Sequence, residues 1–361
     1  MKTFLQPRLR PLAGALLAGA CMAGTGIAAA GPTFHLEKVV TIPGGDSGWD
    51  YPSLDAGRNR LFIAHRDEGL HVYDIRSGKV IRTLARSAGA NTSALAPEFD
   101  LGIVGTRDGH VVVFRLSTLA TLARYKSETD GFDGAAYDPV SKRIAIVGEA
   151  DEDKKQTPVL LFDARTGKPV GKVVVDSIKV DAPRADNQGN LWMPLRDRAA
   201  LARVDVRTMR LAATVPLDAA CRAPAALELD RPDRRIYVGC RGDERTAPRL
   251  LVVDADDART IAAVPIGRGV DEVMYDARHG QVVTANGEDG SLSVIAKQSS
   301  DRYQPVETIG TRPLARTGVL DERTGTIYLV NAQYYKRAGD DGDEDSLHFV
   351  PNTFSVLTYT R

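Results

Sequence analysis

One short pattern returns about every 41 to 50 residues from residue 50 onward, and it constrains the fold more than any other feature of the chain. Each unit begins with an alternating stretch, turns at a loop rich in Asp, Gly and Asn, continues through a β-branched run and reaches apolar residues followed by Asp. The first unit shows the pattern whole, in residues 50–84: DYPSLDAGRNRLFIAHRDEGLHVYDIRSGKVIRTL. Seven such units follow one another, and each is long enough for four strands and their turns.

Runs with a period of two, and almost no helical periodicity after residue 30, predict an all-β chain. Four antiparallel strands per unit make one blade of a β-propeller. Because a single four-stranded blade cannot bury both of its faces, the blades must stack around an axis and cover one another. We therefore predict a seven-bladed β-propeller in which residues 31–361 form a single domain.

The two ends of the chain contain complementary parts of one unit. Residues 35–42, HLEKVVTI, have the pattern of a fourth strand without the three that should precede it. Residues 354–360, FSVLTYT, have the pattern of a third strand with no fourth after it. We expect the two segments to pair, so that the N-terminal strand completes the last blade, closes the ring and removes two exposed sheet edges.

The first thirty residues have the pattern of a secretory signal peptide. Three basic residues precede an apolar run of small residues, 13–27, which ends in three alanines. A lipoprotein signal at Cys21 is the alternative, although Leu17 lies one position too far from this cysteine for the usual motif. No later run of apolar residues is long enough to predict a membrane span. We expect a cleaved signal and a soluble protein that is periplasmic or secreted.

The charge balance excludes partners that need a strongly basic surface. The chain has 47 Lys and Arg residues and 47 Asp and Glu residues. Loss of the first thirty residues, which hold three basic and no acidic side chains, leaves 44 against 47 and a formal charge of −3. No basic field would steer such a protein to nucleic acid or to anionic lipid.

Two of the three cysteines remain after the signal is removed, an even count in an oxidising compartment. Cys221 precedes the first strand of the fifth unit and Cys240 ends its second strand. A hairpin that turns at residues 230–234 brings the two positions together. We expect a disulfide that clamps this blade, provided that the two Cα atoms lie within about 7 Å.

Several phrases resemble the YVTN β-propeller repeat, whose members include the periplasmic YncE-like proteins. These phrases are RRIYVGC at 234–240, GTIYLVN at 325–331, VDVRTMRLAATVPL at 204–217 and VDADDARTIAAVPIG at 253–267. The resemblance covers essentially all of the chain after residue 30, although the letters YVTN never occur and several units are degenerate. It implies the propeller fold and a secreted protein that binds a partner or ligand, and it implies little about activity.

Alignment of the units on the Asp, or its equivalent, before the first turn identifies one position that would form a ring at the mouth of the central channel. The residues at this position are Asp50, Asn91, Asp133, Asp181, Ala225, Asp271 and Arg316. Converging carboxylates repel one another unless a cation, a salt bridge to Arg316 or well-hydrated spacing intervenes. The functional hypothesis is a site for calcium, another divalent cation or a polar ligand, since hard cations prefer oxygen ligands. The alternative is a water-filled rim whose Asp side chains accept backbone N–H groups.

A second candidate metal site lies in the longest loop, between the second and third strands of the last unit. Asp341, Asp343 and Asp345 have the alternating spacing of a calcium loop. The stricter EF-hand pattern fails, because Ser346 replaces the loop glycine and Asn352 replaces the closing Glu. A solvated acidic loop is the alternative.

Catalytic patterns are sparse. None of the six histidines falls in a metal-ligand spacing such as HxH or HExxH. His65 ends a second strand near the channel, where it could act as a base or a ligand if a cavity opens, or simply be hydrogen-bonded. No GxSxG motif or phosphate-binding glycine loop occurs, so we name no catalytic residue. Trp49 and Trp192 are too few for the repeated Trp motifs of a quinone enzyme.

Two functions from different classes remain. The first is a non-enzymatic binding or scaffold propeller for a small molecule, a metal ion or a protein partner. The second is a metal-dependent enzyme of the lactonase or lyase kind, in which a divalent cation on the Asp ring would polarise a carbonyl group. Single-stranded nucleic-acid binding lacks the required basic groove and stacking aromatics. We expect a monomer without enzymatic activity.

Overall fold

The described residues from Phe34 onward form seven four-stranded antiparallel sheets and one short two-stranded sheet of β28 (Tyr334–Tyr335) and β29 (His348–Phe349). This computed structural model describes Met1 and residues 34–45, 48–337 and 346–361. The predicted signal peptide therefore lies outside the described residues except for Met1, and its cleavage stays a prediction. The predicted seven-bladed, all-β architecture is confirmed. Among the described residues, no helix has the length and apolar character needed to cross a bilayer.

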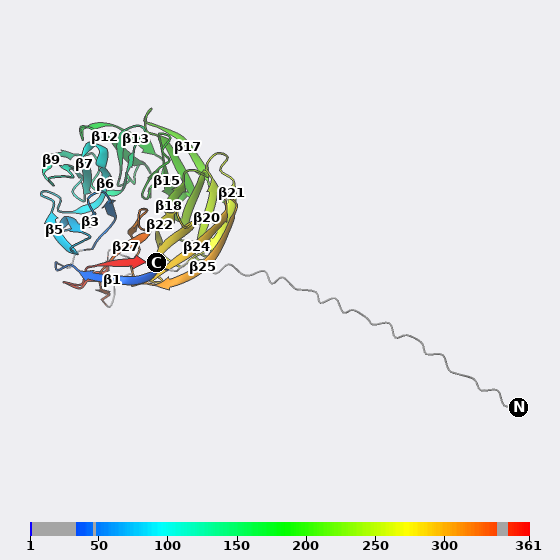
Figure 1. The fold of residues 1–361 in the computed structure, drawn as a ribbon. Coiled ribbons are helices and arrows are strands. Elements are labelled where there is room, and N and C mark those ends of the chain that lie inside the picture. The colour runs from blue at the N-terminus through cyan, green and yellow to red at the C-terminus, as the bar shows by residue number, and fades with distance from the viewer. Residues whose placement is uncertain (2–33, 46–47, 338–345) are drawn as a thin grey trace. The chain divides into compact units, whose positions relative to one another are not determined.

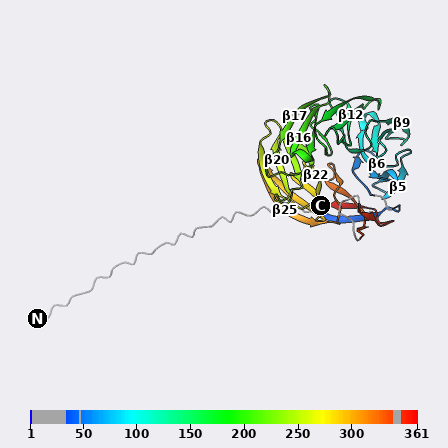
Figure 2. The same cartoon turned by 180° about the vertical axis from the view of Figure 1, so that it is seen from behind.

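Each of the first six blades is a meander of four consecutive strands. Blades 1 to 3 consist of β2 (Pro52–Asp55), β3 (Arg60–His65), β4 (Gly69–Asp74), β5 (Lys79–Thr83); β6 (Ala90–Ala96), β7 (Leu101–Thr106), β8 (His110–Arg115), β9 (Thr121–Lys126); and β10 (Phe132–Asp138), β11 (Arg143–Gly148), β12 (Thr157–Asp163), β13 (Pro169–Val175). Blades 4 to 6 consist of β14 (Arg184–Ala185), β15 (Asn190–Leu195), β16 (Ala200–Asp205), β17 (Arg210–Pro216); β18 (Pro224–Asp230), β19 (Arg235–Cys240), β20 (Arg249–Asp254), β21 (Thr260–Pro265); and β22 (Val270–Asp276), β23 (Gln281–Asn286), β24 (Ser291–Ser299), β25 (Arg302–Gly310). First strands such as β6 and β22 lie toward the centre, and fourth strands such as β9 and β25 lie along the rim (Figures 1 and 2).

The seventh blade is built from both ends of the chain. Its strands are, from the channel outward, β26 (Gly318–Asp321), β27 (Thr326–Asn331), β30 (Ser355–Thr360) and β1 (His35–Thr41). β1 runs antiparallel to β30, from the pair His35 and Thr360 to the pair Thr41 and Ser355, and the two strands lie side by side in Figure 1. The predicted closure by the N-terminal strand is confirmed.

The hydrophobic core lies between adjacent blades. Second and third strands such as β3 and β4 are buried on both faces, whereas fourth strands such as β5 are mostly exposed. Phe62 of blade 1 packs against Phe114 of blade 2, with ring centroids 5.4 Å apart. Each blade thus covers its neighbour, which is why the sequence shows continuous apolar runs in the middle strands and alternation in the outer ones.

Removal of the closing strand tests this architecture. A chain that begins at Ile42 lacks β1 and leaves the edge of β30 unpaired, so it should lose several kcal/mol of stability and should self-associate through that edge. Thermal melts and light scattering would measure both effects, with a chain that begins at Pro32 as the control. An equally stable, monomeric shortened chain would contradict the role assigned to β1.

The expected disulfide joins Cys221 and Cys240. The two Cα atoms lie 5.2 Å apart, across the hairpin of β18 and β19. Both cysteines are fully buried in an apolar cluster with Leu227 and Val238. The bond ties the segment that enters blade 5 to the end of its second strand, as the sequence predicted.

Loss of this disulfide should destabilise the protein without changing its fold. The cysteines are 19 positions apart, and a loop of that length is worth about 3 kcal/mol in the chain-entropy model. The double substitution of Cys221→Ala and Cys240→Ala should lower the free energy of urea unfolding by about that amount. A dithiothreitol-treated wild type should match the double variant; no difference between oxidised and reduced wild type would refute the assignment.

Candidate functional site at the central channel

The aligned position predicted to form a ring is set by a repeated backbone irregularity. In β6, β10, β18 and β22 the strand carries an extra residue at or beside this position, opposite the end of the second strand. Such a β-bulge leaves one residue out of the hydrogen-bond ladder and redirects its side chain. In blade 1 the equivalent Asp50 still donates its backbone N–H to the Ala64 carbonyl, 2.9 Å away. The bulge therefore places the same position of several blades at one end of the channel.

The structure pairs every carboxylate of this ring with a basic side chain. Asp50 lies 3.5 Å from Arg66, and Asp133 lies 2.6 Å from Lys179. Asp181 accepts two hydrogen bonds from Arg196. We call these three carboxylates and Asp271, together with their basic partners, the mouth network.

Asp271 is the centre of the mouth network. It pairs with Arg241 at 2.5 Å, with Arg316 at 3.0 Å and with Arg196 at 3.6 Å. Arg196 thereby links Asp181 of blade 4 to Asp271 of blade 6. Among the described residues, five basic side chains thus pair with four carboxylates, so the salt-bridge explanation applies and extends well beyond Arg316.

The two remaining ring positions carry no charge. The Asn91 side chain donates to the Phe132 carbonyl of the next blade at 2.6 Å, and Ala225 is fully buried. Asp341, Asp343 and Asp345 lie outside the described residues, so the second candidate metal site stays a prediction.

Burial shifts the proton affinity of the mouth network. It raises the pKa of Asp50 to about 7, against the attraction of Arg66, and that of Asp181 to about 8, against the attraction of Arg196. Burial also acts to raise the pKa of Asp271, but Arg241, Arg316 and Arg196 outweigh it and the pKa falls. The pKa of the Tyr51 phenol is raised well above its ordinary value by burial and then by all four ring carboxylates, which places this ring among them.

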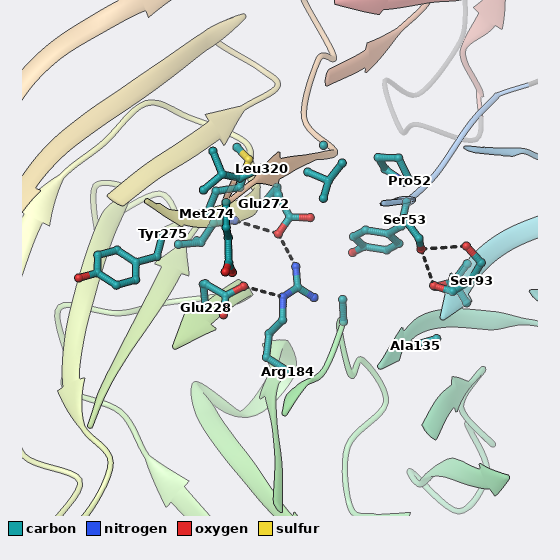
Figure 3. A pocket seen from close by; sticks show the side chains of 17 residues that line it. Pro52, Ser53, Ser93, Ala135, Arg184, Glu228, Glu272, Met274, Tyr275 and Leu320 are labelled. Carbon is teal, nitrogen blue, oxygen red and sulfur yellow. Dashed lines mark hydrogen bonds and ion pairs between the residues drawn. The ribbon is translucent and has the colours of Figure 1, made fainter. Parts of the chain in front are cut away.

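A cavity of about 240 Å³ is lined by Tyr51, Ala182 and Glu272, which directly follow the ring positions Asp50, Asp181 and Asp271 in the sequence. All seven innermost strands or their flanking residues line it, with Ser53 on one side and Arg184 and Glu272 on the other (Figure 3). The Ser53 hydroxyl donates to the Ser93 carbonyl at 2.7 Å. One wall of the cavity therefore presents hydroxyl groups.

The opposite wall of the cavity is an ion-paired triad. The Arg184 guanidinium donates to Glu228 at 3.2 Å and to Glu272 at 2.5 Å (Figure 3). Burial raises the pKa of Glu272 to about 7, partly offset by Arg184. A channel with hydroxyls on one side and charged groups on the other suits a small polar molecule rather than an apolar one.

Sequence reasoning missed most of the basic half of the mouth network. Arg66, Arg196 and Arg241 each follow the last residue of a second strand. The signal was present, because the residue after the second strand is Arg in four units, at positions 66, 107, 196 and 241, and three of these four belong to the mouth network. An alignment of the ends of the second strands, as well as the starts of the first strands, would have found these residues.

The structure is similar to solved β-propellers. The WD40 repeats of RRP9 match with a TM-score of 0.71 and 10% identity, covering 91% of this chain and 100% of that chain. The structure of U3-55K matches with a TM-score of 0.69 and 10% identity, covering 88% and 98%. Hydrazine synthase of Kuenenia stuttgartiensis matches with a TM-score of 0.69 and 11% identity, covering 80% and 94%.

The chain is a seven-bladed β-propeller. No protein-family model matches the sequence, and no curated protein is significantly similar to it. At 10 to 11% identity, the structural similarity shows the fold alone.

The raised pKa of Asp50 predicts how stability depends on pH. Because Asp50 has a pKa of about 7 when folded and an ordinary value when unfolded, the folded state holds the proton more tightly. Its contribution to stability is therefore full at low pH and falls as pH rises from about 4 to about 8. Asp50→Asn should remove this contribution, so its loss of stability between pH 5 and pH 8 should be smaller than that of the wild type by about 2 to 3 kcal/mol.

Urea unfolding at pH 5, 6.5 and 8 would measure this difference, and the exposed Asp256→Asn serves as the control. The comparison of variants is needed because burial lowers the pKa of His71, which gives stability the opposite pH dependence. Parallel pH profiles for wild type and Asp50→Asn would contradict the assignment.

Proposed function

We propose that this chain is a non-enzymatic binding propeller of the YVTN type, secreted or periplasmic, whose channel mouth binds a small organic anion. The observation that carries the proposal is the excess of basic over acidic side chains in the mouth network. Five Lys and Arg residues face four carboxylates, and two of these carboxylates have a pKa of about 7 or 8. At neutral pH the network therefore carries net positive charge.

The geometry of the basic groups also suits an anion. Guanidinium groups from several blades converge on one end of the channel, and such groups bind carboxylate or phosphate with paired hydrogen bonds. Lys179 is 46% exposed, so its ammonium group can contact a ligand without leaving Asp133 uncovered. The polar cavity below has room for the rest of a small ligand.

The metal-dependent enzyme is less well supported than binding. A divalent cation on the ring would have to displace the basic partner of each carboxylate and would meet the positive charge of the remaining partners. Secretion is supported by the Cys221–Cys240 disulfide, because such bonds persist in oxidising compartments. A protein partner that presents an acidic group could use the same mouth.

Two lysines with equal exposure allow a matched test. Lys179 pairs with Asp133 in the mouth network. Lys172, which lies on β13, pairs with Glu128 outside it. Both lysine side chains are 46% exposed. Isothermal titration with citrate and with inorganic phosphate at constant ionic strength should show binding to the wild type. Lys179→Met should weaken this binding about tenfold, equal to about 1.4 kcal/mol, through the loss of a charged hydrogen bond.

Lys172→Met should bind both anions like the wild type. Equal loss in both variants would indicate general screening rather than a site. Binding of calcium chloride with no response to either anion would overturn the proposal and restore the cation site.

A further inference from the structure

Three side chains capable of binding metal converge at the end of the first hairpin of blade 1, outside the mouth network. His65 is the last residue of β3, His71 lies in β4, and Glu68 lies in the turn between them. The pairing of His65 with Gly69 and of Ile63 with His71 makes the two histidines diagonal neighbours on one face of the hairpin. Glu68 is brought back over them by the turn, in which its N–H donates to the His65 carbonyl at 2.9 Å.

The three donor atoms have the separations of a coordination site. His65 Nδ1 lies 2.9 Å from His71 Nε2, and Glu68 Oε2 lies 3.6 Å from the first atom and 3.4 Å from the second. From these three distances, one point lies about 2.1 Å from all three atoms, the usual length of a bond from zinc to nitrogen or oxygen. An ion at that point would lie within bonding distance of all three donors and would replace the hydrogen bond between the two imidazole nitrogens.

Each donor is also held by a contact on its far side. The second ring nitrogen of His71, Nδ1, hydrogen-bonds Thr83 Oγ1 at 2.9 Å. The His65 ring stacks on Phe354, with centroids 4.3 Å apart and planes inclined by 14°. The other carboxylate oxygen of Glu68 accepts the Gly45 N–H. Such outer contacts orient metal ligands and are typical of built sites.

The burial of the cluster favours a metal over an exposed group of polar residues. His65 is fully buried and His71 is 5% exposed, whereas Glu68 is 28% exposed and opens the cluster to solvent. Two imidazoles and one carboxylate are the ligand set of open zinc sites, with a fourth position left for water. Imidazole donors select transition metals over calcium or magnesium.

We propose that His65, Glu68 and His71 bind a divalent transition-metal ion of the zinc class. The site lies where the ring closes, because Gly45 belongs to the segment that leaves β1 and Phe354 precedes β30. A bound ion would connect the first blade to both strands that complete the seventh. Binding to the folded state alone would therefore stabilise the seam of the ring.

Zinc titration of the purified protein, prepared without a histidine tag, tests this site. We expect one equivalent to bind with a dissociation constant of about 1 µM or lower and to raise the melting temperature. Cobalt should produce the visible absorption of a four-coordinate ion, and magnesium should have no effect. His71→Ala should abolish binding.

Glu68→Gln keeps the test decisive even where a buried histidine cannot be removed without unfolding. Its side chain is partly exposed, so the variant should fold, and the loss of the carboxylate should weaken zinc binding at least tenfold. His110→Ala, which removes a histidine paired with Asp108 elsewhere, should bind zinc like the wild type. Wild-type binding only above about 100 µM, or equal affinity in Glu68→Gln, would overturn the proposal. Neither result bears on anion binding at the channel mouth, which is measured without metal.

Discussion

The whole arrangement depends on the backbone hydrogen bonds between β1 and β30. These bonds join residues from opposite ends of the chain, and they give the seventh blade the fourth strand that the other six receive from consecutive sequence. Because the closed ring fixes every blade relative to its neighbours, residues remote in sequence meet at the channel. Thr317, for example, donates to the Asp50 carbonyl across 267 positions of the chain. A site made of one residue from each blade exists only when the ring is closed.

Stability alone does not account for the charges at the channel mouth. Burial of paired charges costs desolvation energy that the attraction between them only partly returns. The equivalent positions in two blades hold Asn91 and Ala225, so the fold itself does not require a carboxylate there. The carboxylates instead hold Arg66, Arg196 and Arg241 in place with their side chains only about one-fifth exposed, and such partial burial strengthens the attraction of a guanidinium group for an anionic ligand.

The sequence was sufficient for the fold because the same information is repeated seven times. Strand order, blade number, closure and the Cys221–Cys240 bond all follow from the period and from the positions of turns, which are local properties. The partners of the ring carboxylates were missed because the alignment followed first strands, whereas Arg66 and Arg196 follow second strands. The cluster of His65 and His71 was missed for a different reason. Its spacing matches no linear metal motif, since diagonal neighbours of a hairpin are separated by a turn of any length.

At the end of β3, two adjacent residues belong to different sites: His65 to the proposed metal site and Arg66 to the mouth network. Successive residues of a strand point to opposite faces, so His65 faces Phe354 at the seam while Arg66, the next residue, faces Asp50 at the channel mouth. The hairpin turn that carries Glu68 toward the histidines also sets the backbone from which Arg66 extends. An ion at the seam would therefore restrain the segment that presents one of the five basic groups, while it contacts none of the mouth network itself. Rigid placement of such groups before a ligand arrives lowers the entropic cost of binding, which gives the closing seam a direct physical connection to the proposed binding function.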